Sequence, residues 1–117
     1  MGIEDLKLRF KSAAVQLVLD LNVIQFPALE YDVKRQLVRS CSSAAANYRA
    51  ACRAKSRADF IYKLKIVEEE TDETLFWLEF LRDLGTTLAH HESSEKEYKE
   101  LLAITVSSIK TSKSKLS

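Results

Sequence analysis

Glycine and proline are almost absent from this chain, which has two glycines, Gly2 and Gly85, and one proline, Pro27, among 117 residues. The two residue types together make up roughly 12% of an average protein and supply most tight turns. Their scarcity excludes most turn-rich all-β architectures and collagen-like repeats. It also excludes a glycine-rich phosphate-binding loop, because no segment holds more than one glycine. The chain must therefore consist mainly of helices.

Apolar side chains recur every three or four residues in four segments, which is typical of helices with one buried face. The predicted helices span residues 3–24, 29–53, 57–84 and 95–109. Short connections make neighbouring helices antiparallel. The pattern therefore predicts an all-α fold, an up-down-up-down antiparallel four-helix bundle.

Local signals mark the helix ends. Pro27 separates the first two helices, because the residue before a proline is pushed out of the helical conformation. Ser56 and Asp59 are spaced as a capping box at the start of the third helix, and Gly85 ends it. We expect residues 1–117 to form a single domain, with a disordered tail over residues 110–117, which are rich in serine and lysine.

Two features indicate a cytoplasmic protein. No apolar run reaches the ~18 residues needed to cross a membrane, and the charged N-terminus does not resemble a secretory signal. Cys41 and Cys52 lie eleven residues apart on one predicted helix, a rise of about 16 Å that is too long for a disulfide within that helix. We expect both to be reduced thiols in the core, as in a cytosolic protein.

Charge is distributed unevenly along the chain, although the net charge is only +1. Residues 34–65 carry nine basic groups and one acidic group, whereas residues 66–100 carry three basic and eleven acidic groups. On a helix, four of these arginines fall within about 80° of one another. Two basic residues of the following turn extend this surface, and Lys63 and Lys65 lie near enough to join it. The candidate nucleic-acid contacts are Arg35, Arg39, Arg49, Arg53, Lys55 and Arg57.

Three interpretations of this basic surface remain open. A row of guanidinium groups suits phosphates, so it can contact nucleic acid. It can instead be a solvated face or pair with the acidic run Glu68–Glu73, or it can bind an acidic protein. No aromatic residue interrupts the row, so sequence-specific reading of a single strand is not supported.

Catalytic and metal-binding patterns are missing from the sequence. A di-iron bundle needs Glu-x-x-His pairs, but the two histidines, His90 and His91, fall in a predicted loop and neither follows a glutamate by three residues. We interpret His90-His91-Glu92 as a polar turn. No residues are spaced as a nucleophile with its base. We therefore expect no enzyme activity, no metal and no cofactor.

The end of the third helix is apolar around more of its circumference than a bundle helix needs. An isolated bundle would expose large side chains here, and exposed apolar patches usually mark a partner. The predicted oligomer interface consists of Phe76, Trp77, Phe80 and Leu84. The second helix instead carries very small residues from Ser42 to Ala46, where we expect tight packing around Ala44.

Short motifs between Arg39 and Gly85 carry a family resemblance. This segment reads RSCSSAAANYRAACRAKSRADFIYKLKIVEEETDETLFWLEFLRDLG. It follows the patterns R-S-G-x-S-x-x-A-N-x-x-E-A, S-x-x-D-F-x-x-K-L and W-L-x-x-L-x-x-x-G, with Cys41 in place of glycine and Ala50 in place of glutamate. It resembles the bacterial four-helix bundle proteins encoded within intervening sequences of 23S rRNA genes. The matching positions are Arg39, Ser40, Ser43, Ala46, Asn47, Ala51, Ser56, Asp59, Phe60, Lys63, Leu64, Trp77, Leu78, Leu81 and Gly85.

The resemblance implies more than the residues do. It implies a bundle that assembles into a ring-like homopentamer. Related bundle proteins are accessory subunits of diversity-generating retroelements, where a basic pentamer binds nucleic acid and the reverse transcriptase. By analogy it supports nucleic-acid contact through Arg39, Arg49, Arg53 and Lys55. The alternative it leaves open is a structural or adaptor protein that binds a protein partner, such as that reverse transcriptase.

Overall fold

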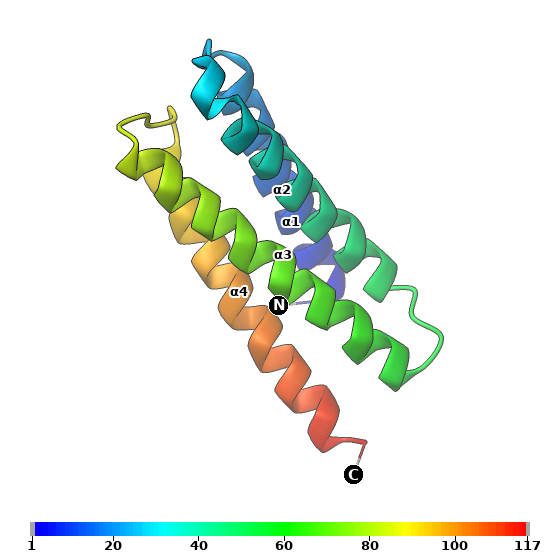
Figure 1. The fold of residues 1–117 in the computed structure, drawn as a ribbon. Helices are drawn as coiled ribbons and strands as arrows, with labels where there is room; N and C mark the ends of the chain where they lie inside the picture. Colours follow the sequence, from blue (N-terminus) through cyan, green and yellow to red (C-terminus); the bar gives the residue numbers. More distant parts are fainter. Residues whose placement is uncertain (1, 117) are drawn as a thin grey trace.

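The chain folds into four long helices that lie side by side (Figure 1). The computed structural model describes residues 2–116, so Met1 and Ser117 of the predicted domain lie outside the described residues. The helices are α1 (Ile3–Asn22), α2 (Tyr31–Ala51), α3 (Arg57–Asp83) and α4 (His91–Ser114), with a short 3-10 turn, η1 (Ala28–Glu30), before α2. Residues 2–116 contain no strand, and the predicted all-α bundle is confirmed.

The bundle is elongated, measuring 50 × 20 × 20 Å. α2 packs between α1 and α3, and α3 packs on α4. The α1–α4 side is the least tightly packed, and there Arg9 bridges to Glu97 at 2.6 Å and to Glu100 at 3.1 Å. α1 and α3 therefore occupy diagonal corners of the bundle. The α1–α2 and α3–α4 connections lie at one end and the α2–α3 turn lies at the other (Figure 1).

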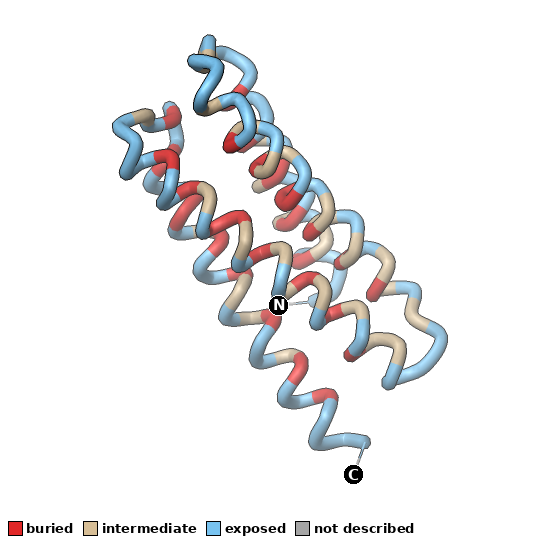
Figure 2. The backbone as a smooth tube through the Cα atoms, in the orientation of Figure 1, coloured by how far each residue is buried: buried red, intermediate tan, exposed pale blue. Residues whose placement is uncertain are grey.

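Buried residues lie along the inward side of every helix (Figure 2). Burying each large apolar side chain contributes about 1.5–3 kcal/mol to folding. On α2 the buried stripe includes small residues, and both Cys41 and Ala44 are fully buried. This agrees with the tight packing that we expected around Ala44. Burial raises the pKa of the Cys41 thiol to about 12, so this thiol is inert at neutral pH. Cys52 is partly buried, and neither cysteine forms a disulfide.

At the ends of α3, the predicted Gly85 ending is confirmed, whereas the predicted capping box is formed only in part. The Asp59 N–H donates to Ser56 Oγ at 3.1 Å, which caps the helix. The Asp59 carboxylate accepts the N–H of Lys55, also at 3.1 Å, one residue before the usual capping-box donor. At the other end Gly85 has a φ of 96°, and the N–H of Thr86 donates to the Leu81 carbonyl. The helix thus ends in a left-handed backbone conformation, which glycine adopts more readily than other residues.

The prediction for the fourth helix was too short at both ends. α4 begins at His91 rather than at residue 95, because the His91 ring is buried and anchored to the neighbouring elements. It continues to Ser114, because Ser112 extends the buried stripe beyond the expected end at Ile109. The tail predicted to be disordered over residues 110–117 is therefore helical through Ser114. No helix within residues 2–116 is long and apolar enough to span a lipid bilayer.

Candidate nucleic-acid interface

The basic residues of α2 form an exposed row on its outward face, opposite the buried stripe. Arg35, Arg39 and Arg49 on α2 are exposed, as their spacing predicts, and so is Arg53, which lies in the turn just after the helix. The row divides into two halves that differ in their partners. Its N-terminal half is neutralised by carboxylates, whereas its C-terminal half is not.

Arg39 is held by the acidic run of α3. Its Nη1 lies 2.9 Å from a carboxylate oxygen of Glu70, its Nη2 donates to Glu73, and its Nε donates to Gln36 at 3.1 Å. The hydrogen bond to Glu73 is the main cause that raises the pKa of Arg39, and it outweighs the opposing effect of burial. Arg35 has a weaker partner, with its Nη1 3.5 Å from the Asp32 carboxylate. The interpretation that the acidic run pairs with the basic row thus applies to Arg39.

Arg49 and Arg53 have no carboxylate within 4 Å among residues 2–116. Arg49 borders a shallow groove of about 470 Å³ between α1 and α2. We call this the basic groove, and it is lined by Lys7, Lys11, Ala45, Ala46 and Arg49. Three of its five lining residues are cationic and none is acidic. The two alanines keep its floor low.

The two lysines of the groove were missed by the sequence analysis. Lys7 and Lys11 belong to residues 1–33, which carry more acidic than basic groups, so charge counting drew no attention to them. Their spacing of four residues places them on one face of α1, and this spacing is the sequence feature that could have identified them as a pair. Only the packing of α1 on α2 brings them beside Arg49. Lys7 is also paired with Glu4 at 3.1 Å.

Lys55 and Arg57 lie in and just after the α2–α3 turn, at the end of the bundle next to Arg53. Both are exposed. Lys63, which the sequence placed near this surface, is paired with Asp59 at 2.8 Å. Its hydrogen bond is the main cause that lowers the pKa of the Asp59 carboxyl, so Lys63 adds little net charge. Lys65 is exposed on α3.

The predicted oligomer interface is an exposed apolar surface on α3, which we call the aromatic patch: Phe76, Trp77, Phe80 and Leu84. Phe76 is 52% exposed and Phe80 is 40% exposed. Trp77 is partly buried and lies edge-on to both, with ring centroids 4.9 Å and 5.5 Å away. Its indole N–H donates to Glu73 at 3.1 Å. Within a single chain this surface contacts solvent, as the prediction required.

A second exposed apolar surface was not foreseen. Along the outward side of α1 lie four residues that we call the α1 stripe: Leu8, Val15, Leu19 and Val23. Leu8 is 62% exposed and Leu19 is 57% exposed. Only the inward stripe of this helix was predicted. The spacing of these residues, seven, four and four, was the signal that could have revealed them.

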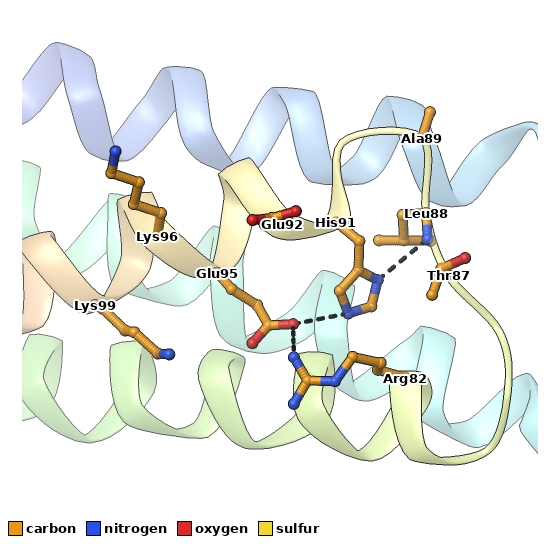
Figure 3. Close-up of a pocket in the computed structure, with 9 residues that line it drawn as sticks. All are labelled: Arg82, Thr87, Leu88, Ala89, His91, Glu92, Glu95, Lys96 and Lys99. Carbon is orange, nitrogen blue, oxygen red and sulfur yellow. Dashed lines mark hydrogen bonds and ion pairs between the residues drawn. The ribbon is translucent and has the colours of Figure 1, made fainter.

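A pocket of about 730 Å³ lies between the end of α3 and the start of α4 (Figure 3). Glu95 is buried there, with its Oε1 2.6 Å from Arg82 Nη1 and 3.3 Å from His91 Nε2. His91 Nδ1 accepts the N–H of Leu88, so Nε2 carries the proton and donates to the Leu78 carbonyl at 2.8 Å. These groups satisfy one another, so the pocket is best explained as a structural clamp on the α3–α4 connection.

The interpretation of His90-His91-Glu92 as a polar turn was therefore wrong for His91, which is buried and begins α4, and for Glu92, which is the second residue of that helix. His90 does precede the helix. Its N–H donates to the buried carboxylate of Asp20 on α1 at 3.0 Å, which ties the same connection to a second helix. No group of three or more histidine, cysteine or acidic residues within residues 2–116 is placed to hold a metal ion.

Comparisons with known proteins agree with the fold. A family model described as "23S rRNA-intervening sequence protein" matches residues 5–108. A solved structure of a protein of unknown function from the S23 ribosomal protein family of Bacteroides thetaiotaomicron VPI-5482 is 35% identical in sequence. It superposes with a TM-score of 0.82 over 94% of this chain and 99% of that one. No curated protein matches this chain.

Proposed function

The chain belongs to the family of 23S rRNA-intervening sequence proteins, and from that premise we propose that it is a non-enzymatic, homo-oligomeric protein that binds the backbone of nucleic acid through the basic groove. The observation that carries this proposal is the groove itself, which brings cations from two helices together with no acidic residue in its lining. We also propose a cytoplasmic location, which the two free cysteines support.

The chemistry of the groove suits phosphates. Arg49 can donate a pair of hydrogen bonds to a phosphate, and Lys11 adds a point charge from the opposite wall. The low floor at Ala45 and Ala46 allows a phosphate to approach the α2 backbone. The groove offers no aromatic side chain for base stacking. We therefore expect recognition of the backbone, with little dependence on sequence.

Self-association would make this contact stronger. The aromatic patch and the α1 stripe are both exposed in one chain, and patches of this kind usually mark interfaces. We propose that they join copies of this chain, with five copies favoured by the resemblance. Each copy adds a groove, and repeated weak sites bind a long polyanion much more tightly than one site does.

Two matched triple variants test the binding surface. In the first, Lys11, Arg49 and Arg53 become glutamine, and in the second, Arg35, Arg39 and Lys63 become glutamine. Each phosphate contact contributes about 0.9 to the salt slope on duplex DNA, or about 0.7 on a single strand. At protein concentrations at which both variants are assembled, we expect the first to bind duplex DNA and RNA more weakly with a flatter salt slope, and the second to bind nearly as the wild type does. Equal losses in both would contradict the groove, and no wild-type binding at ~50 mM salt would contradict nucleic-acid binding altogether.

The aromatic patch also favours a second candidate function. An exposed cluster of three aromatic rings is the kind of surface that anchors a protein partner. In this alternative the bundle is an adaptor for a protein, such as the reverse transcriptase of a diversity-generating retroelement. A wild-type protein that is monomeric, does not bind nucleic acid and binds such a polymerase would favour the adaptor role.

A further inference from the structure

A chain of hydrogen bonds connects the basic row of α2 to the aromatic patch of α3. The guanidinium of Arg39 donates to Glu70 and to Glu73, and the Glu73 carboxylate accepts the indole N–H of Trp77 at 3.1 Å. Both hydrogen bonds to Glu73 reach the same oxygen, Oε2. The side chain of Glu73 is thus held between a cation on one helix and the indole on its own helix.

We propose that Arg39 is a positioning residue for the aromatic patch and not a contact for nucleic acid. It fixes the carboxylate of Glu73, and that carboxylate fixes the indole of Trp77 in the orientation that the patch presents. The consequence for assembly rests on the proposed function, in which this patch joins copies of the chain.

The guanidinium of Arg39 is already committed within the subunit. Its Nε and both of its terminal nitrogens each donate to a side chain of α2 or α3. A phosphate would have to displace two carboxylates that lie close to this group, and those carboxylates would repel the phosphate. Arg49 lies more than two helical turns further along the same exposed row, and no carboxylate of residues 2–116 has to be displaced there or would repel a phosphate. The two arginines therefore look alike in sequence but differ in role.

The orientation of Trp77 determines the shape of the patch. Its ring plane lies at 76° to that of Phe76 and at 69° to that of Phe80, so it meets both rings edge to face. Such contacts depend on ring orientation. An indole that loses its acceptor at Glu73 is free to turn its N–H toward water, and both edge contacts would then change. Glu73 in turn needs Arg39, because Glu70 places a second negative charge beside it.

The single tryptophan of the chain makes this connection measurable. In a two-dimensional nitrogen–proton spectrum it gives one indole N–H signal. Three variants are compared with the wild type: Arg39→Gln, Glu73→Ala and the matched control Arg49→Gln. We expect the first two to shift the indole signal and the control to leave it in place. The double variant Arg39→Gln/Glu73→Ala should give the signal of Glu73→Ala alone, because both changes act through one contact.

Assembly and binding are measured on the same proteins. We expect Arg39→Gln to raise the concentration at which the oligomer dissociates by about tenfold, with nucleic-acid affinity of the remaining oligomer unchanged. Arg49→Gln should leave the dissociation of the oligomer unchanged and lower the affinity for nucleic acid. Arg39→Lys, which keeps the charge but loses the fork, should restore the signal only in part.

Two failures remain distinguishable in this design. A monomeric wild type overturns the proposed assembly. An indole signal that Arg39→Gln does not move overturns the positioning role, whatever the state of assembly. A loss of nucleic-acid affinity in Arg39→Gln equal to that in Arg49→Gln would return Arg39 to the binding surface and also overturn the inference.

Discussion

His91 is the residue that joins three parts of the chain at the α3–α4 end of the bundle. Its ring accepts the N–H of Leu88 in the connection and donates to the carbonyl of Leu78 in α3, while its backbone begins α4. The ring is buried, so water cannot replace it readily. A helix terminus that would otherwise fray is thereby fixed against its neighbour.

Replacement of His91 by alanine should destabilise the fold. It leaves the buried N–H of Leu88 without a partner, removes the second hydrogen bond to the carbonyl of Leu78, and should reduce the free energy of unfolding by about 2 kcal/mol. For a domain of this size the melting temperature would fall by roughly 10 °C. Glu92→Gln is the control, because Glu92 is the exposed next residue and should change the free energy of unfolding by less than about 0.5 kcal/mol. Equal melting temperatures for His91→Ala and the wild type would show that the clamp does not stabilise the fold.

Glu73 gives the aromatic patch a dependence on pH. Burial raises the pKa of this carboxyl, but the hydrogen bonds from Arg39 and Trp77 and the charge of Arg39 outweigh burial and hold it below the ordinary 4.5. The pKa is lower in the folded state, so the contact stabilises the fold above pH 4.5 and is lost as the pH falls through the lower folded value.

The emission of Trp77 should therefore change in an acid titration with a midpoint below pH 4.5. The groups that face Glu73 are Arg39 on α2 and Glu70 on its own helix. Glu73→Gln is the control. It should remove this transition and leave the other acid transitions of the protein in place. A midpoint above 4.5, or a transition that persists in Glu73→Gln, would show that another group is responsible.

At the scale of single elements, α2 packs against the core on one face and lines the basic groove on the opposite face. Ala44 is fully buried against the core, while Ala46, two residues away, is exposed on the floor of the basic groove. The same residue type thus serves close packing on one side and access for a ligand on the other. A pair of identical substitutions can separate the two roles.

Ala44→Leu should overpack the core and reduce the free energy of unfolding by about 1–3 kcal/mol. Ala46→Leu should leave the free energy of unfolding within about 0.5 kcal/mol of the wild type, since its side chain points to solvent. It should nevertheless lower the affinity for nucleic acid, because the larger side chain fills the floor of the groove. Urea unfolding and a gel shift on both proteins test this. Unchanged stability in Ala44→Leu would mean that this face of α2 is loosely packed.

Comparison of the elements shows what the sequence can predict. The period of the apolar residues was sufficient to predict the number and order of the helices. Local signals at Ser56 and Gly85 were sufficient to predict where α3 begins and ends. The start of α4 was misplaced because the signal there is tertiary: a histidine next to another histidine looks like a polar turn until Leu78 is brought beside it. Single-helix reasoning also cannot assign partners. Arg39 and Arg49 share one exposed row, and only the neighbouring helix, α3 or α1, determines which one is neutralised.

At the scale of the whole molecule, the two exposed apolar surfaces lie on opposite sides. The aromatic patch is on the outward side of α3, the α1 stripe is on the outward side of α1, and these helices occupy diagonal corners. A contact between the patch of one copy and the stripe of the next uses two different surfaces, so it would repeat from copy to copy. Such a head-to-tail contact forms a ring when the rotation between copies closes and an open filament when it does not. The proposed homo-oligomer requires the closed form. Every copy would then present α2 on the same side, and the basic grooves would form one continuous surface.

Two surface variants and their mixture test this arrangement. Phe76→Ser/Phe80→Ser removes the patch, and Val15→Ser/Leu19→Ser removes the stripe. If the patch of one copy binds the stripe of the next, each variant alone is monomeric by light scattering. An equal mixture forms a dimer and nothing larger, because one intact patch meets one intact stripe. If instead patch binds patch, the stripe variant assembles as the wild type does and the mixture adds nothing.

The ring also makes a prediction for binding: the mixed dimer has two grooves, so it should bind long RNA more weakly than the wild-type ring and more tightly than either monomer. A mixed dimer that binds no better than the monomers would show that the grooves do not form one surface.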